Sequence, residues 1–136
     1  EREAEPRLLG GDAVWPPVTD LPRALAFYQG VLGFRLMGQS EHLGHTLTHL
    51  YMGRGYLVLI QQDEAAQPGE ECIPDWPRLS LRVIGLDALV ERLARADVRV
   101  VQRPAAASYG PRVALLADPD GHLIALTEGE WIYSHR

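Results

Sequence analysis

Cysteine is almost absent from this sequence, since Cys72 is the only one in 136 residues. A single thiol cannot form an internal disulfide, which indicates a reducing compartment, and we expect a cytoplasmic protein. Two glutamates precede Cys72 and disfavour its thiolate, and no base adjoins it. We therefore expect an inert thiol in a linker rather than a nucleophile.

Long apolar runs and basic clusters are also missing. No run is long enough to span a membrane, and the first ten residues lack the basic-then-apolar order of a signal peptide. The formal net charge is −5 at pH 7, and no cluster of basic residues would hold a phosphate backbone. We therefore expect neither a membrane nor a nucleic acid as partner.

The remaining composition is that of a soluble globular domain, with 46% hydrophobic and 23% charged residues. Its two halves predict the same order of elements, namely a strand, a helix and three strands. The predicted division is a first module at 11–62, a linker at 63–76, a second module at 77–128 and a tail at 129–136. Because one small sheet leaves a face uncovered, we expect the two modules to pair.

The most distinctive stretch is Asp118-Pro119-Asp120-Gly121, which lies between two apolar runs. Proline presets φ in a tight turn and glycine tolerates its exit geometry, so the stretch predicts a β-hairpin. The second of the two hairpin strands is expected to run from Leu123 to Thr127.

Three motifs in this order resemble the vicinal oxygen chelate superfamily, which includes glyoxalase, extradiol dioxygenases and bleomycin resistance proteins. The motifs run over 18–28, 31–34 and 118–126. The resemblance implies an α+β fold in which two βαβββ modules form a curled mixed sheet with a central cleft. It also implies a homodimer, and the apolar Trp131-Ile132-Tyr133 would cap a cleft or pack on the partner chain.

Enzymes of this superfamily hold a divalent metal through one residue from the first strand and one from the last strand of each module. In this sequence three of those positions fall on Ala13, Arg78 and Ala125, and the fourth falls near Val58 or Leu59. Alanine offers no lone pair, and arginine carries a positive charge that repels a cation. We therefore expect no metal, no cofactor and no catalytic residues.

Strand alternation then predicts the side chains that face the cleft. Trp15 fits a cleft wall as well as a core or edge position, and Arg78 and Arg82 fit an anion clamp as well as a solvated strand face. The expected ligand-binding residues are Ala13, Trp15, Arg78, Ser80, Arg82, Ala125 and Thr127. The opposite strand faces should pack on the helices.

The hypothesis that follows is a metal-free small-molecule-binding protein of the glyoxalase/bleomycin resistance type, which sequesters a planar, partly anionic ligand. The alternative is a metal-dependent lyase, isomerase or dioxygenase with ligands from His45, His49 or a second chain. His45 and His49 share a strand face, but their Cβ atoms would lie roughly 13 Å apart, too far for one zinc ion. The role of His42 stays open, and a regulatory or structural interaction module is a third hypothesis.

Overall fold

The computed structural model describes residues 6–8, 12–62, 77–106 and 110–130. Cys72, the predicted linker at 63–76 and the Trp131-Ile132-Tyr133 segment lie outside these ranges. The module boundaries therefore stay a prediction. In the described part of the chain, no helix combines the length and the apolar character needed to cross a bilayer.

The order of the elements confirms the predicted repeat. The first half contains β1 (Ala13–Val14), β2 (Pro17–Val18), α1 (Leu21–Leu25), a π-helical continuation η1 (Ala26–Val31), β3 (Arg35–His42), β4 (His45–Tyr51) and β5 (Tyr56–Gln61). The second half contains β6 (Leu79–Arg82), α2 (Leu86–Arg95), β7 (Arg99–Ala106), β8 (Arg112–Ala117) and β9 (Leu123–Glu128). One difference from the prediction is that the first strand is two short strands, because a break at Trp15-Pro16 interrupts it.

The first helix begins and ends at the residues that its local sequence favours. The Asp20 side chain accepts a hydrogen bond from the Arg23 backbone N–H at 3.2 Å, and Pro22 lies in the first turn, where its missing N–H costs nothing. The helical turns stop before Gly33, whose φ of +82° suits a residue without a Cβ. Asp20 is thus the cap, while the neighbouring Thr19 bonds to Asp120.

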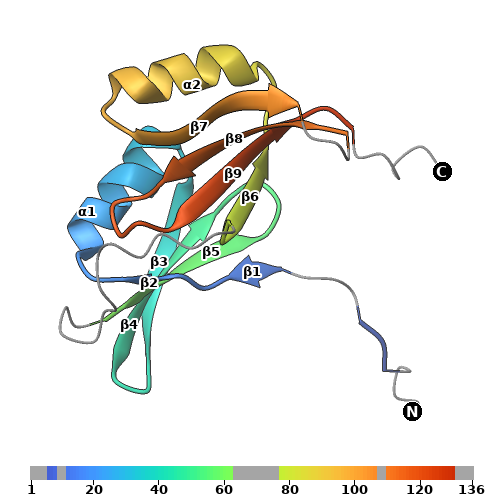
Figure 1. Cartoon of the computed structure of the whole chain (residues 1–136). Coiled ribbons are helices and arrows are strands. Elements are labelled where there is room, and N and C mark those ends of the chain that lie inside the picture. The colour runs from blue at the N-terminus through green and yellow to red at the C-terminus, as the bar shows by residue number, and fades with distance from the viewer. Residues whose placement is uncertain (1–5, 9–11, 63–76, 107–109, 131–136) are drawn as a thin grey trace.

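The strands form two mixed sheets (Figure 1). Sheet A has the order β1-β5-β4-β3, with β2 also paired to β5, and sheet B has the order β6-β9-β8-β7. In each sheet the strand before the helix runs parallel to the last strand, and the other pairs are antiparallel. This mixed α+β architecture confirms the predicted fold class.

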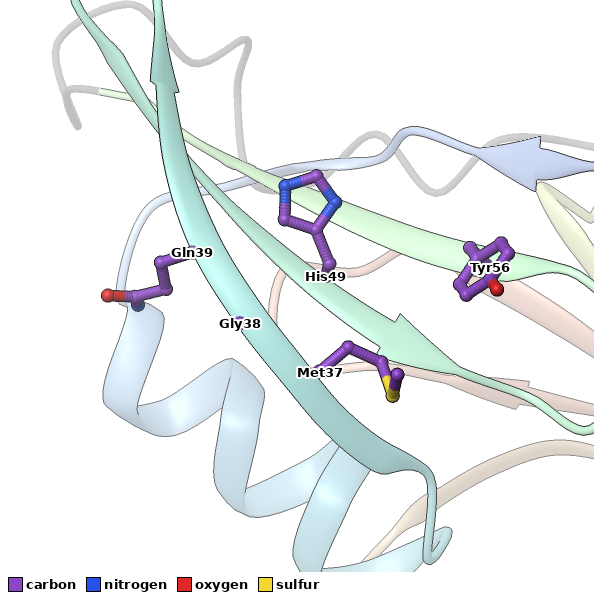
Figure 2. A pocket seen from close by; sticks show the side chains of 5 residues that line it. All are labelled: Met37, Gly38, Gln39, His49 and Tyr56. Atoms are coloured by element: carbon purple, nitrogen blue, oxygen red, sulfur yellow. The ribbon is translucent and has the colours of Figure 1, made fainter.

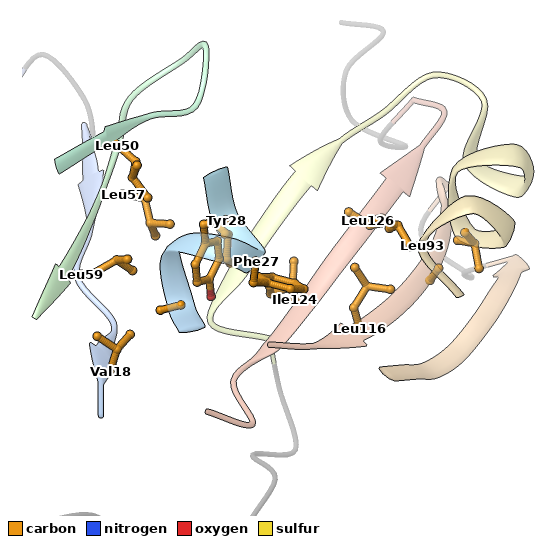
Figure 3. Close-up of a cluster of buried hydrophobic side chains, with 14 of the residues drawn as sticks. Val18, Phe27, Tyr28, Leu50, Leu57, Leu59, Leu93, Leu116, Ile124 and Leu126 are labelled. Atoms are coloured by element: carbon orange, nitrogen blue, oxygen red, sulfur yellow. The ribbon is translucent and has the colours of Figure 1, made fainter. Parts of the chain in front are cut away.

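One apolar core joins the two halves. Figure 3 shows Phe27 and Tyr28 of the first helical segment between Leu57 of sheet A and Ile124 of sheet B. The helix α2 adds Leu86, Val90 and Leu93 to the same cluster. The strand faces predicted to pack on helices do so, with Val18, Leu79, Ile124 and Leu126 buried and Val14, Leu81 and Val83 packed around them.

Candidate ligand-binding site

The turn between β8 and β9 has the geometry that its sequence predicts. The Gly121 N–H donates to the Asp118 carbonyl at 2.9 Å and closes the turn. The Asp118 Oδ1 atom accepts from the backbone N–H groups of Asp120 at 2.9 Å and His122 at 2.8 Å. One carboxylate oxygen therefore holds the loop conformation from inside.

This turn also fastens the second half of the chain to the first. The Tyr28 hydroxyl donates to Asp118 at 2.5 Å, and the Thr19 hydroxyl donates to Asp120 Oδ1 at 2.7 Å. The His122 Nε2 lies 2.6 Å from the Pro17 carbonyl, and because a carbonyl only accepts, Nε2 carries the proton. The hairpin motif thus has a structural role at the junction of the two sheets.

Burial governs the protonation of the Tyr28–Asp118 pair. Loss of water raises the pKa of the Asp118 carboxyl, and the hydrogen bond from Tyr28 only partly opposes this rise. Burial and the neighbouring carboxylate both raise the pKa of the Tyr28 hydroxyl. Tyr28 therefore remains a neutral hydrogen-bond donor.

A hollow of about 410 Å³ opens on the face of sheet A that is turned away from α1 (Figure 2). We call this the outer face of sheet A, and its side chains alternate with those that enter the core. The hollow is lined by Met37, Gly38, Gln39, His49 and Tyr56. These residues come from the neighbouring strands β3, β4 and β5.

A β-bulge in β3 changes which of its side chains reach this face. Leu36 pairs with Leu50 and Gly38 pairs with His49, so Met37 is an extra residue in β3. Arg35 and Met37 lie on the outer face before the bulge, and the extra residue brings Gly38 and Ser40 onto it after the bulge. Figure 2 accordingly shows the Met37 side chain on the same side as Tyr56 and His49.

Tyr56 is the aromatic residue of the lining, and a second tyrosine ring lies beside it. The Tyr51 and Tyr56 rings lie 5.4 Å apart with an angle of 50° between their planes. Ala13 pairs with Tyr56 and Pro17 with Ile60, which sets Trp15 level with Val58, the partner of His49. Trp15 and His49 thus lie on opposite sides of β5, and Trp15 is 52% exposed.

The residues that the sequence predicted for the site are divided between the two sheets. Ala13 and Trp15 flank β5 in sheet A. The side chains of Arg78, Ser80 and Arg82 are exposed in or next to β6 in sheet B, where Arg82 lies 3.4 Å from Glu130. None of the predicted residues lines the hollow.

The last strand contributes two further predicted residues, Ala125 and Thr127. They pair with Ser80 and Arg82 in β6, but they are only 4% and 5% exposed. The Thr127 hydroxyl donates to the Leu81 carbonyl at 3.4 Å. Within a single chain these two side chains thus offer little surface to a ligand, and their role in binding stays a prediction.

The side chains at the family's metal positions do not fit the divalent metal that the superfamily implies. The family positions hold Ala13, Ala125 and the buried apolar Val58 or Leu59, none of which has a side-chain lone pair. His45 and His49 have separate partners, the Gln61 carbonyl at 3.1 Å and the Ser40 hydroxyl at 2.8 Å. Among the described residues, no group of three His, Cys, Asp or Glu side chains could hold an ion.

Sequence reasoning missed four residues of the hollow, namely Met37, Gly38, Gln39 and Tyr56. Tyr56 could have been found, because a parallel pairing of the first strand with the last strand of the module places it beside Ala13. Gly38 had no comparable signal, because it reaches the outer face only through the bulge.

Comparison with known proteins agrees with this architecture. The model of the glyoxalase/bleomycin resistance protein/dioxygenase superfamily matches residues 16–126, so the chain belongs to this family. This confirms the resemblance seen in the three motifs. No curated protein matches the chain.

Solved structures show the same fold. TnmS3, an antibiotic binding protein from Streptomyces sp. CB03234, is 26% identical with a TM-score of 0.74 over 93% of this chain and 100% of TnmS3. A glyoxalase/bleomycin resistance protein from the same organism is 29% identical, with a TM-score of 0.64 over 86% of this chain and 99% of that one. TioX from Micromonospora sp. ML1 is 24% identical with a TM-score of 0.67, over 89% and 99% of the two chains, and this likeness shows the fold alone.

Proposed function

We propose that this protein binds a small planar organic molecule on the outer face of sheet A and sequesters it without transforming it. The observation that carries the proposal is the hollow of about 410 Å³ lined by Met37, His49 and Tyr56. Pockets of this size and largely apolar character are typical of small-molecule sites. Similarity to the antibiotic binding protein TnmS3 supports the same function.

The shape and chemistry of the lining favour a flat, aromatic ligand. The Tyr51 hydroxyl donates to the Gly53 carbonyl at 2.6 Å, which fixes one ring against Tyr56. Aromatic faces and a thioether contact a planar molecule over a large area at low entropic cost. Exposed Met37 and Tyr56, at 51% and 41%, would lose water on binding, which is the main driving force we propose.

The lining has few groups that could catalyse a reaction of the ligand, which favours sequestration over catalysis. His49 is the only ionisable group of the lining besides the Tyr56 phenol, and it already bonds to Ser40. The family metal positions hold side chains without donor atoms, so no Lewis acid would be held there. The alternative of a metal-dependent enzyme would need another donor set.

We propose that Arg78 and Arg82 meet an anionic group of the ligand. Guanidinium groups bind carboxylates bidentately, but both arginines belong to sheet B rather than to the hollow. The family resemblance implies a homodimer with clefts shared between chains, and such a dimer would bring β6 of one chain to sheet A of its partner. Light scattering on the purified protein tests the dimer: a molar mass of one chain would contradict it.

The central experiment is a calorimetric titration with 9-oxofluorene-2-carboxylate, a rigid planar aromatic acid. We expect 1:1 binding per chain, and a loss of about five- to twentyfold in affinity in Tyr56→Ala and Met37→Ala, because each removes apolar contact area. The control is Ile84→Ala, since Ile84 is equally apolar and fully exposed but lies outside the hollow. Equal losses in all three variants, or no binding by the wild type, would contradict the proposal.

A second titration separates sequestration from metal-dependent catalysis. After treatment with a chelator, we expect unchanged affinity for the same acid and full recovery of the unmodified compound. Tightly bound stoichiometric metal in the purified protein, together with binding that the chelator abolishes, would favour the enzyme.

The anion clamp is tested with an Arg78→Ala, Arg82→Ala double variant, titrated with the acid and with its carboxamide. The double variant should bind the acid more weakly than the wild type does, and its affinity for the carboxamide should be unchanged.

A further inference from the structure

His49 contributes an imidazole ring to the lining of the hollow. It lies in β4 between Gly38 of β3 and Val58 of β5, and the rest of the lining is mostly apolar or aromatic. Its ring makes one hydrogen bond, between Nε2 and the Ser40 hydroxyl oxygen, which lie 2.8 Å apart. Ser40 and His49 point to the same face because both belong to the outer set of their strands.

The second ring nitrogen of His49 is available to a ligand. Figure 2 shows the two nitrogens on opposite sides of the ring, with one of them turned toward Tyr56. Because Nε2 bonds to Ser40, the nitrogen on the Tyr56 side is Nδ1. No hydrogen bond from Nδ1 occurs among the described residues.

The hydrogen bond with Ser40 fits a tautomer of the ring in which Nδ1 carries the proton. A neutral imidazole has one donor and one acceptor, and an imidazole nitrogen is a better acceptor than an alcohol oxygen. When the Ser40 O–H donates to Nε2, the proton must lie on Nδ1, so Nδ1 becomes a donor that points into the hollow. The hydroxyl is free to rotate into this orientation, since no other hydrogen bond of Ser40 is found in the described part of the chain.

We propose that His49 is the specificity-determining residue of the site, donating its Nδ1–H to an in-plane carbonyl oxygen at the edge of the planar ligand. The inference rests on the proposed function and defines the ligand class more closely, as planar aromatic ketones rather than plain polycyclic hydrocarbons. Ser40 is a positioning residue, because it acts on the ligand only through the imidazole. A ligand without an acceptor would leave the Nδ1–H without a partner when water is displaced, which penalises its binding.

The test uses two probes that differ by one carbonyl group, 9-oxofluorene-2-carboxylate and fluorene-2-carboxylate. We expect the wild type to bind the ketone two- to tenfold more tightly, the value of one neutral hydrogen bond. His49→Phe should bind both probes equally, because it keeps a flat ring without the donor. His49→Gln, which supplies an amide N–H, should keep part of the preference.

Two further variants, Ser40→Ala and His45→Phe, test the positioning role of Ser40 and provide a control for His49. Loss of the Ser40 hydroxyl should reduce the ketone preference while affinity for fluorene-2-carboxylate stays the same. His45→Phe is the matched control, because His45 belongs to the same strand but bonds to the Gln61 carbonyl, and its preference should equal that of the wild type.

Three results would overturn the inference. The first is equal affinity of the wild type for both probes, and the second is a ketone preference that persists in His49→Phe. A lost preference in His45→Phe would be the third, because it would show an effect not specific to His49. Failure of both probes to bind the wild type would instead contradict the proposed function itself, so the two failures are distinguishable.

Discussion

The Tyr28 hydroxyl donates a hydrogen bond to the Asp118 carboxylate at 2.5 Å, although 90 positions separate the two residues. Tyr28 belongs to the helical segment of the first half, and Asp118 begins the β8–β9 turn of the second. The same carboxylate holds its own turn through two backbone N–H groups. A single buried side chain therefore connects the local turn to the packing of one half on the other.

Tyr28→Phe should lower the free energy of unfolding by about 1.5–3 kcal/mol, since it leaves a buried carboxylate oxygen without its donor. Denaturant unfolding measures this loss. The control is Tyr51→Phe, which removes a hydroxyl that bonds to the exposed Gly53 carbonyl and should cost less than about 1 kcal/mol. Equal losses in the two variants would show that the Tyr28 hydroxyl has no special role.

The stability contributed by Asp118 should fall as the pH rises. Burial raises the pKa of Asp118 above its ordinary 3.8 in the folded protein, so the folded state binds the proton more tightly than the unfolded chain. The contribution is fully present below the ordinary value and is lost as the pH rises through the raised one. Asp118→Asn should remove this decline, as measured by urea unfolding from about pH 3 to about pH 7.

Asp87→Asn is the control of opposite sign. The hydrogen bond from Arg112 lowers the pKa of the exposed Asp87, so its contribution is present above the ordinary value and is lost as the pH falls. The difference in the free energy of unfolding between the wild type and Asp118→Asn should therefore change with pH in the opposite direction from the difference between the wild type and Asp87→Asn. A common direction would contradict the assignment of the Asp118 shift to burial.

Glu128→Ala should destabilise the second half through the start of α2. The Glu128 carboxylate accepts from the backbone N–H groups of Gly85 at 2.8 Å and Leu86 at 3.2 Å, which replaces the side-chain cap that Gly85 cannot supply. Loss of a helix cap costs about 0.5–2 kcal/mol. Glu91→Ala, which removes only the exposed ion pair with Arg103, should cost less than about 1 kcal/mol. Thermal unfolding that ranks the two variants in the reverse order would contradict this role.

Gly55→Ala should be more harmful than Gly53→Ala. Both glycines have positive φ, +82° and +97°, but a Cβ at Gly55 would lie 2.9 Å from the Asp12 carbonyl oxygen, whereas a Cβ at Gly53 meets nothing within 4 Å. We expect backbone strain to lower the free energy of unfolding by about 1–3 kcal/mol at each site. At Gly55 a further loss should follow, because the new Cβ pushes β1 away from β5. Because Gly55 directly precedes Tyr56, which lines the hollow, Gly55→Ala should also weaken binding of the planar acid more than Gly53→Ala does. Equal affinities in the two variants would contradict the role of Tyr56 in binding.

The sequence by itself determined the elements and their order. Proline and glycine at Asp118-Pro119-Asp120-Gly121 define a turn through local backbone preferences, and helical spacing after Asp20 defines α1. The repeat of these local signals at a constant offset was enough to predict the α+β fold and the faces that pack on the helices. These features depend on neighbours within a few residues, so they can be read along the chain.

Only the tertiary structure decided where the hollow lies. Gly38 and Ser40 share its face because β3 gains a residue against β4, and such a bulge depends on cross-strand register rather than on local preference. The sequence offered His49 only as an alternative metal ligand, whereas the fold places its ring in the hollow with Tyr56 and bonds it to Ser40. Arg78 and Arg82 are exposed on the predicted face of their strand, yet they belong to sheet B and not to the sheet that forms the hollow. Alternation predicts which side chains share one face of a strand, but it cannot predict which strands meet at a site.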